Sequence, residues 1–173
     1  MSSVIGLVLG GAIVAIAVIG VVVAVGMRRR SPAALEAVRR FSRAVVNPRV
    51  MKTAGTPGAY ASVVHHVGRT TGRSYETPVA AEPTDDGFVI ALPYGTMSNW
   101  VKNVVASGSA TITDEGATYR VDRPQLLPLV EMIDHFPEKD RRSLARFRVD
   151  QCLRVRAVDR LEPPEHIHHL AAG

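Results

Sequence analysis

The sequence predicts a mainly β protein: a small antiparallel barrel with short helices, preceded by a single transmembrane helix. Three observations predict it. Residues 4–26 hold no charged side chain and consist only of Val, Ile, Leu, Ala and Gly. Six or seven short apolar stretches then alternate with glycine-containing turns between residues 60 and 158, as they do in small antiparallel barrels. A chain of 173 residues has room for one such domain and a short appendage.

The apolar run at the start of the chain has the length of a membrane span. Twenty-three helical residues extend about 34 Å, and a hydrocarbon core is about 30 Å thick. A cleaved signal peptide is the alternative, but it has a positive start and a shorter apolar region. Residues 1–3 carry no side-chain charge, and Arg28, Arg29 and Arg30 follow the run. We therefore expect residues 1–30 to form a single-pass anchor in the cell membrane, with the domain on the cytoplasmic side.

The net charge of +5 is unevenly distributed along the chain. Residues 28–52 contain eight Arg and Lys against one acid, and residues 53–173 contain thirteen against fifteen. The basic excess therefore belongs to the segment after the anchor, where each basic residue attracts anionic lipid headgroups by about 1 kcal/mol. The globular part has no basic excess, which argues against nucleic acid as a partner.

Residues 31–58 are expected to form a juxtamembrane helix and a linker. Ser31-Pro32 is typical of a helix start, and apolar residues recur at helical spacing after it, at Leu35, Val38, Phe41 and Val45. This amphipathic basic helix is expected to lie on the membrane surface or against the domain. An ordinary domain helix with one solvated face is an equal alternative. Residues 47–58, with two prolines and two glycines, form the linker.

The barrel domain is expected over residues 59–162, before a tail at 163–173. Strands are expected over 60–67 and 75–81 around the turn 68–73, and over 88–92 after an Asp-Asp-Gly turn. Ser98 predicts a helix over 99–106, with Gly108 beyond its end. A hairpin of 109–113 with 117–121, helical patches near 129–134 and 138–147, and a last strand over 151–158 complete the domain.

Cysteine and histidine give no metal site. A single cysteine, Cys152, excludes an intramolecular disulfide, and its apolar surroundings favour burial as a small hydrophobe. His65 and His66 are adjacent in a strand, so they point to opposite faces and cannot chelate one metal. The tail histidines lack carboxylates or cysteines at ligand spacing. No metal is predicted, and no acid–base pair is evident, so catalytic residues stay unassigned.

Two segments have the composition of an anion and ring site. Glycines at both ends of the loop 68–73 permit close approach to a ligand, its backbone N–H groups can form an anion-binding concavity, and its arginines and threonines suit phosphate or carboxylate. A solvated hairpin turn is the alternative. The helix start at Ser98 offers further N–H groups. Trp100 either stacks on a flat ring or packs in the core, and Tyr94 either binds a ring carbonyl or caps the barrel.

These residues resemble the deazaflavin-dependent nitroreductase family, which includes F420H2-dependent quinone reductases. The family pattern is a Gly-Arg-basic-Ser/Thr-Gly loop, a Thr-Pro or Asn-Pro pair and a later Trp-X-X-Asn helix. Here it is matched in order by Gly68 to Arg73, by Thr77-Pro78 and by Trp100 to Asn103. The resemblance implies a split β-barrel of the FMN-binding type and coenzyme F420 as cofactor, with FMN as the runner-up.

The resemblance also implies which residues bind the cofactor. The tail would contact Arg69, Thr70 and Thr71, and the ring would lie against Thr77, Pro78 and Val79. The pocket would be completed by Leu92, Pro93, Tyr94, Gly95, Trp100, Val101 and Asn103. The usual second basic residue of the loop is replaced by Thr70, and Arg73 is the candidate to compensate for it.

The implied function is a membrane-anchored oxidoreductase. It would transfer a hydride from reduced F420 to a quinone, such as menaquinone, or to a nitro-type acceptor. The alternative is a non-catalytic protein that binds deazaflavin, flavin or haem at the membrane. The expected partners are this small-molecule acceptor and membrane lipids. Gly6 and Gly10 have the spacing of a helix-pairing motif, which leaves a homodimer open.

Overall fold

Seven strands form one antiparallel sheet in the computed structural model, which describes residues 25–26, 29 and 31–161. The strands are β1 (Ser62–Val67), β2 (Ser74–Val79), β3 (Ala81–Thr84), β4 (Gly87–Ala91), β5 (Ser109–Asp114), β6 (Ala117–Pro128) and β7 (Gln151–Leu161). Their order across the sheet is β2-β1-β5-β6-β7-β4-β3. Mainly β structure is therefore confirmed, and the curled sheet with few helices fits the split-barrel class.

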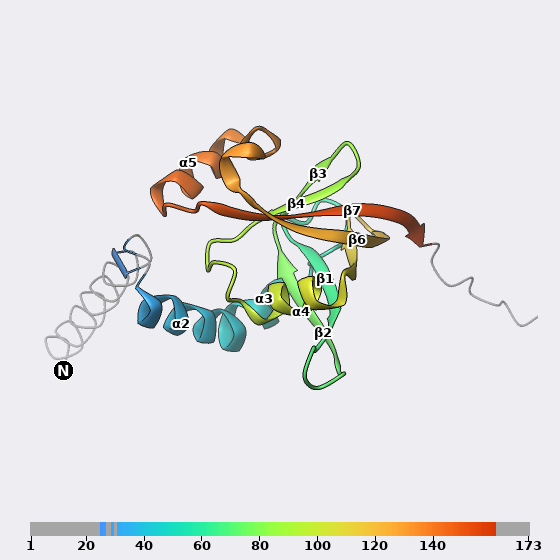
Figure 1. Ribbon diagram of the computed structural model, residues 1–173, viewed down its shortest axis with the longest axis horizontal. Coiled ribbons are helices and arrows are strands. Elements are labelled where there is room, and N and C mark those ends of the chain that lie inside the picture. The colour runs from blue at the N-terminus through green and yellow to red at the C-terminus, as the bar shows by residue number, and fades with distance from the viewer. Residues whose placement is uncertain (1–24, 27–28, 30, 162–173) are drawn as a thin grey trace, which may run out of the picture.

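The helices lie at the start of the described chain and between strands. They are α2 (Pro32–Phe41), a π-helical turn η1 (Ser42–Val46), α3 (Asn47–Val50), α4 (Asn99–Ser107), two 3₁₀ turns η2 (Leu129–Glu131) and η3 (Ile133–His135), and α5 (Glu138–Arg146). Figure 1 shows α2, α3 and α4 on one side of β7 and α5 on the other. The loops that meet between these two groups of helices line the site described below.

The connection from β2 to β3 brings the two edges of the sheet together. β2 and β3 are the outermost strands, yet only Ala80 separates Val79 from Ala81. Two residues of extended chain span at most about 7 Å, so the edges meet at this corner. A flat seven-stranded sheet would hold its edge strands roughly 28 Å apart, at about 4.7 Å per strand. The sheet must therefore curl into a barrel, which is split along the remaining length of these two edges.

The core lies on both faces of β4. Phe88 and Ile90 point into the barrel and pack with Val64, Ile112, Val121 and Leu153. Val89 points the other way, into a smaller cluster with Leu129, Phe136 and Cys152. This alternation is the period of two that strands impose. Because β4 is covered on both faces, its sequence is continuously apolar from Phe88 to Ala91.

The structure differs from the expected elements in three places. The strand expected over 75–81 divides at Ala80, because its two halves pair at opposite edges of the sheet. Part of the expected linker is helical, at Asn47–Val50, where Pro48 sits in the first turn that tolerates it. The strand expected to stop at residue 121 continues to Pro128. Two register irregularities, the second between Asp122 and Gln125, let it pass Pro124.

The predicted membrane anchor lies almost wholly outside the described residues, as does the predicted tail. Within the described part of the chain, no helix has the length and apolar character needed to span a membrane. The anchor and the cytoplasmic orientation of the domain stay predictions.

Candidate functional site

A pocket of about 770 Å³ opens between the barrel and the helices. This volume is within the range of about 300–1,000 Å³ that is usual for small-molecule and cofactor sites. Its walls come from α2, η1 and α3, from β2 and β3, from the segment between β4 and α4, and from α5. Twelve of the fourteen predicted site residues line it: Arg69, Thr70, Thr71, Thr77, Pro78, Val79, Leu92, Pro93, Tyr94, Gly95, Trp100 and Asn103.

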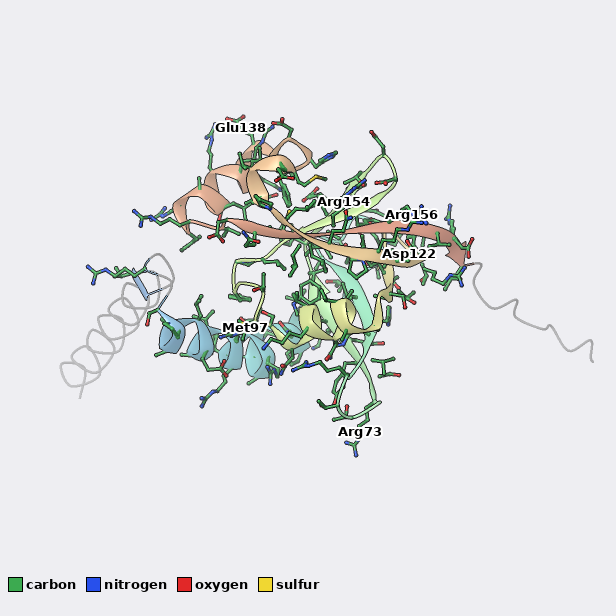
Figure 2. The ribbon with its side chains drawn as sticks, in the orientation of Figure 1. Arg73, Met97, Asp122, Glu138, Arg154 and Arg156 are labelled. Atoms are coloured by element: carbon green, nitrogen blue, oxygen red, sulfur yellow. The ribbon has the colours of Figure 1, made fainter. Side chains whose placement is uncertain are left out.

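The two remaining predicted residues lie elsewhere. Arg73 is exposed at the tip of the β1–β2 hairpin, and Figure 2 shows its side chain extending away from the body of the protein. Val101 is 1% exposed and belongs to the barrel core. In a helix, residues 100 and 101 point in directions about 100° apart, so only Trp100 of this pair lines the pocket.

The loop 68–73 uses its backbone N–H groups internally. Gly68 donates to the Arg73 carbonyl at 2.8 Å, and Thr71 and Gly72 both donate to the Gly68 carbonyl. Arg69 N–H donates to the side chain of Asn103 at 3.2 Å. The backbone concavity expected for an anion is therefore not formed. The donors with which this loop can bind a ligand are its side chains and the Thr70 N–H, which has no partner among the described residues.

Gly68 is required by the packing of this loop. A Cβ at this position would lie 2.4 Å from Thr71 Oγ1 and 2.7 Å from Tyr75 Cε2. Such distances do not occur in folded proteins, so an alanine here would displace the loop or the ring. We expected this glycine to let a ligand approach the backbone closely. Its contacts show instead that it lets the loop pack closely against Thr71 and Tyr75 of the same hairpin.

A chain of hydrogen bonds connects the loop to the barrel wall. Arg69 Nη1 donates to Asn103 Oδ1 at 2.9 Å. Asn103 Nδ2 and His66 Nδ1 are 3.1 Å apart, and His66 Nε2 lies 3.1 Å from Thr77 Oγ1. His66 and Asn103 are buried, and all four residues line the pocket. We name these four residues the polar relay. It joins three segments that the family pattern lists separately.

His66 is one of the pocket residues that the sequence analysis did not assign to a site. The pKa of its ring is lowered, first because burial penalises the charged form and second because His65 lies beside it. The ring is stacked on Tyr75, with centroids 5.8 Å apart and planes 21° apart. His65 points outward, toward Thr113 and Glu76. The opposite orientation of the two histidines was expected from the strand period.

The start of α4 faces the pocket. Ser98, Asn99 and Trp100 line it. Ser98 occupies the N-cap position, but its hydroxyl donates to the Gly95 carbonyl and does not cap the helix. The side chain of Trp100 is half-buried and packs against the barrel core from its rim. Trp100 therefore borders both the core and the pocket, and its stacking on a flat ring stays a prediction.

The segment formed by α2 and η1 is one wall of the pocket, a location that the sequence analysis left open. Arg39, Ser42 and Arg43 line it, and Ser42 Oγ lies 3.1 Å from Tyr94 Oη. Arg39 pairs with Glu36 at 3.3 Å, but its Nε is buried and has no hydrogen-bond partner among the described residues. The signal that could have found Arg39 and Arg43 is their spacing of four residues in the basic, amphipathic segment formed by α2 and η1. A π-helical turn at Ser42–Val46 is a frequent mark of functional sites.

The wall across the pocket is acidic. Glu82 of β3 and Asp140 of α5 line it, together with Tyr60. Burial raises the pKa of Glu82, and the charges of Asp140 and Asp114 raise it further, against a smaller opposing effect of Lys139. The pKa of Tyr60 is raised by burial and then by Asp140 and Glu82. No local pattern indicates this group, because its members are about twenty and sixty residues apart along the chain.

Cys152 lies in the smaller core cluster and not in the pocket. It is fully buried and its thiol donates weakly to the Leu127 carbonyl. Burial raises the pKa of the thiol to about 11, and Glu131 adds to the shift. A thiol of this kind is not nucleophilic at neutral pH. Among the described residues, no group of three or more His, Cys, Asp or Glu is arranged to hold a metal ion.

Comparison with known proteins gives distant matches in structure alone. No protein-family model matches the chain, and no curated protein matches it. An F420 reductase is similar over 64% of this chain and 94% of its own, with 11% identity and a TM-score of 0.44. The haem storage protein HutZ from Vibrio cholerae is similar over 65% and 89%, with 10% identity and a TM-score of 0.43. A protein of unknown function from Agrobacterium tumefaciens is similar over 59% and 50%, with 14% identity and a TM-score of 0.40.

Proposed function

We propose that the protein is an oxidoreductase that binds reduced coenzyme F420 in this pocket and transfers a hydride to a quinone or nitro-type acceptor. One observation carries the proposal. Twelve residues assigned to the cofactor on motif resemblance come from four separate stretches of sequence, and they line a single pocket. A motif match that arose by chance would not require its parts to converge on one cavity.

The pocket suits a flat ligand with an anionic tail. Among the described residues, Asn103 alone accepts from the Arg69 guanidinium group, through Nη1, so most of that group is free for a ligand. Arg39 adds a buried Nε without a partner among the described residues, and Arg43 lies one turn further along the same segment. Guanidinium groups bind phosphate and carboxylate with charge-assisted hydrogen bonds. We propose that Arg39 and Arg43, and not Arg73, compensate for the missing basic residue at position 70.

The chain's own residues would orient the ring and exclude water. Thr77, Pro78 and Val79 form one wall and Trp100 borders another. When bound, the deazaflavin supplies the hydride from its own ring carbon, so no side chain has to act as nucleophile. The protein's contribution is then to hold donor and acceptor at reacting distance. A pocket without an obvious acid–base pair is compatible with this chemistry.

The acceptor is proposed from the predicted membrane anchor. Arg39 follows Arg30, the end of the basic flank, by nine residues. Seven of these steps are helical, so the pocket wall lies within about 18 Å of the anchor's end. Tethering at this distance raises the effective concentration of any acceptor dissolved in the bilayer. A quinone is the acceptor class that this arrangement favours.

The test is a titration of the full-length protein in detergent with reduced F420, followed by addition of a menaquinone analogue. Binding is read from the fluorescence of the oxidised form and from direct calorimetry. We expect saturable binding and oxidation of the reduced cofactor above the protein-free rate. No binding of either redox form would exclude the proposal.

A non-catalytic binder is the second candidate, and its ligands can be separated by the same titration. Tight F420 binding without turnover over a panel of quinones and nitro compounds would favour it. FMN in place of F420 tests the runner-up cofactor. Haem is the least favoured ligand, because both ring nitrogens of His66 are engaged in the polar relay.

A further inference from the structure

The orientation of the Asn103 amide is fixed by its neighbour. Arg69 approaches it with a backbone N–H and with Nη1, at 3.2 and 2.9 Å. Both groups can only donate, so the atom they contact must be the amide oxygen. The amide nitrogen of Asn103 is thereby directed at His66 Nδ1, at 3.1 Å. This assignment follows from donor and acceptor chemistry alone.

The tautomer of His66 follows from the amide. Because Asn103 Nδ2 donates, His66 Nδ1 must accept, and a neutral ring then carries its hydrogen on Nε2. The lowered pKa of this ring, caused first by its burial, is in keeping with a neutral form. Stacking on Tyr75 holds the ring plane. His66 Nε2–H therefore donates to Thr77 Oγ1 at 3.1 Å.

The Thr77 hydroxyl is left with one free proton. A hydroxyl has one hydrogen to donate, and here its oxygen already accepts from His66. Within the described part of the chain, His66 is the one hydrogen-bond partner of the Thr77 side chain. Thr77 lines the pocket between Glu76 and Pro78. Its proton is thus unsatisfied by protein and available to a ligand.

We propose that His66 is a positioning residue that makes Thr77 an obligate donor to the ligand. The polar relay holds the hydroxyl so that its proton points into the pocket, toward a hydrogen-bond acceptor on the edge of a flat heterocycle. A ring carbonyl oxygen or an unprotonated ring nitrogen has the required chemistry. The identity of that heterocycle rests on the proposed function. The Thr77 proton would then make the site prefer a ring edge that accepts a hydrogen bond over one that donates.

The tautomer can be measured without a ligand. Full-length protein with ¹⁵N-labelled histidine is examined in detergent at pH 7 by long-range ¹H–¹⁵N correlation, and the His66→Asn variant identifies the signals of His66. The expected pattern is a neutral ring with its hydrogen on Nε2. A ring protonated on Nδ1, whether neutral or charged, overturns the inference.

The donor role is measured with F420 and two variants of Thr77. Thr77→Val keeps the shape and removes the hydroxyl, and we expect it to weaken binding roughly 3- to 10-fold, the worth of one neutral hydrogen bond. Thr77→Ser keeps the hydroxyl and should bind within about twofold of the wild type. Equal affinity of both variants and the wild type overturns the inference while the proposed function stands.

The connection between the two residues is measured by a double-mutant cycle. His66→Asn places an oxygen near the former Nδ1, so it keeps an acceptor for Asn103 and loses the donor to Thr77. In combination with Thr77→Val it should weaken F420 binding no further than Thr77→Val alone, because the two residues act as one unit. Additive losses contradict the relay. If the wild type binds no F420, the proposed function fails, and the tautomer still decides the inference about His66.

Discussion

Arg69 and Arg73 leave the same loop, yet their guanidinium groups meet different surroundings. Arg69 lines the pocket and is held by Asn103. Arg73 extends from the hairpin tip (Figure 2). Both side chains carry one positive charge and both are exposed, so each would contribute similarly to the long-range attraction of an anion. A contact with a bound anion would separate them, which makes the pair a matched test of the site.

The first prediction concerns this pair. Arg69→Ala removes charge-assisted hydrogen bonds worth about 1.5–3 kcal/mol, so F420 affinity should fall roughly 10- to 100-fold. Arg73→Ala removes the same charge outside the pocket and should change affinity less than about threefold. The measurement is F420 titration of both variants at one ionic strength. Equal losses would show that the loop acts only through its net charge.

The second prediction concerns Glu82, whose pKa is raised above its ordinary value of 4.5 by burial and by Asp140. A carboxyl with a raised pKa in the folded state stabilises the fold below the unfolded value and loses this contribution as pH rises through the folded value. At pH 7 the ionised group is therefore a cost. Glu82→Gln should raise the melting temperature by about 1–2 °C at pH 7.

The advantage of Glu82→Gln should shrink as the pH falls below 4.5, where the wild-type carboxyl is itself neutral. Thermal unfolding of both proteins over a pH series measures this difference. An equal difference at every pH would assign the effect to the shape or hydrogen bonds of the side chain and not to its charge.

The sites of single residues were predictable from sequence where the residues belong to a motif. They were not predictable where a contact with a residue distant in sequence places them. Arg69 and Asn103 belong to the pattern, and the structure brings them into contact. His66 was expected only to point away from the face of His65, because nothing in a strand sequence reveals a hydrogen bond to a helix residue thirty-seven positions later. Glu82 and Asp140 had no local signal at all.

At the scale of elements, the segment from α2 to α3 was predicted to contain a helix, but its place in the molecule was not predicted. The spacing of its apolar residues indicated a helix, but it did not show whether this helix packs against the membrane or against the domain. The structure puts one side of this helix against the pocket, at Arg39 and Ser42. Phe41 remains 59% exposed. The helix thus serves the domain with one face and retains an apolar side chain on another.

The third prediction tests this helix with two adjacent arginines. Arg39 is mostly buried at the pocket, and Arg40 is mostly exposed. Arg39→Ala should weaken F420 binding roughly 3- to 30-fold through loss of a hydrogen bond to the anionic tail. Arg40→Ala should leave the affinity within about twofold, since an exposed charge contributes little. The two variants lose the same charge from the same helix. Similar behaviour in F420 titrations would remove α2 from the binding site.

The element boundaries that sequence missed share one physical cause. Strand pairing is decided by partners, so Ala80 can divide one apolar stretch between two sheet edges. The bulge after Asp122 similarly carries β6 past Pro124 because β7 continues to pair beyond it. Turn signals placed most strand ends correctly, whereas long-range pairing set those that a local pattern could not.

At the scale of the whole molecule, basic charge gathers on the segment that follows the predicted anchor, and this segment also exposes apolar side chains. Residues 28–52 hold the basic excess, and Phe41 and Val46 are exposed within it. Basic residues with apolar neighbours suit the headgroup region of an anionic membrane. The same segment lines the pocket. A bilayer beside α2 would therefore put a lipid-soluble acceptor close to the site.

The fourth prediction tests the anchor on which this arrangement depends. The full chain should stay with the membrane pellet after alkaline carbonate extraction, because a span of this length inserts essentially irreversibly. Val14→Arg with Val18→Arg places two charges near the middle of the apolar run. Each costs about 2.5–3.5 kcal/mol of insertion free energy, so the double variant should move largely to the supernatant.

A matched control keeps the charge and changes its position. Ser2→Arg with Ser3→Arg adds two positive charges before the run, where they do not enter the hydrocarbon core, so this variant should remain in the pellet. Activity with a membrane-dissolved acceptor should depend on the anchor. Oxidation of reduced F420 by menaquinone in vesicles should fall for the Val14 and Val18 variant, while oxidation by a water-soluble quinone should not. Equal rates with both acceptors in both variants would separate the chemistry of the pocket from the membrane and leave the acceptor to be sought in the aqueous phase.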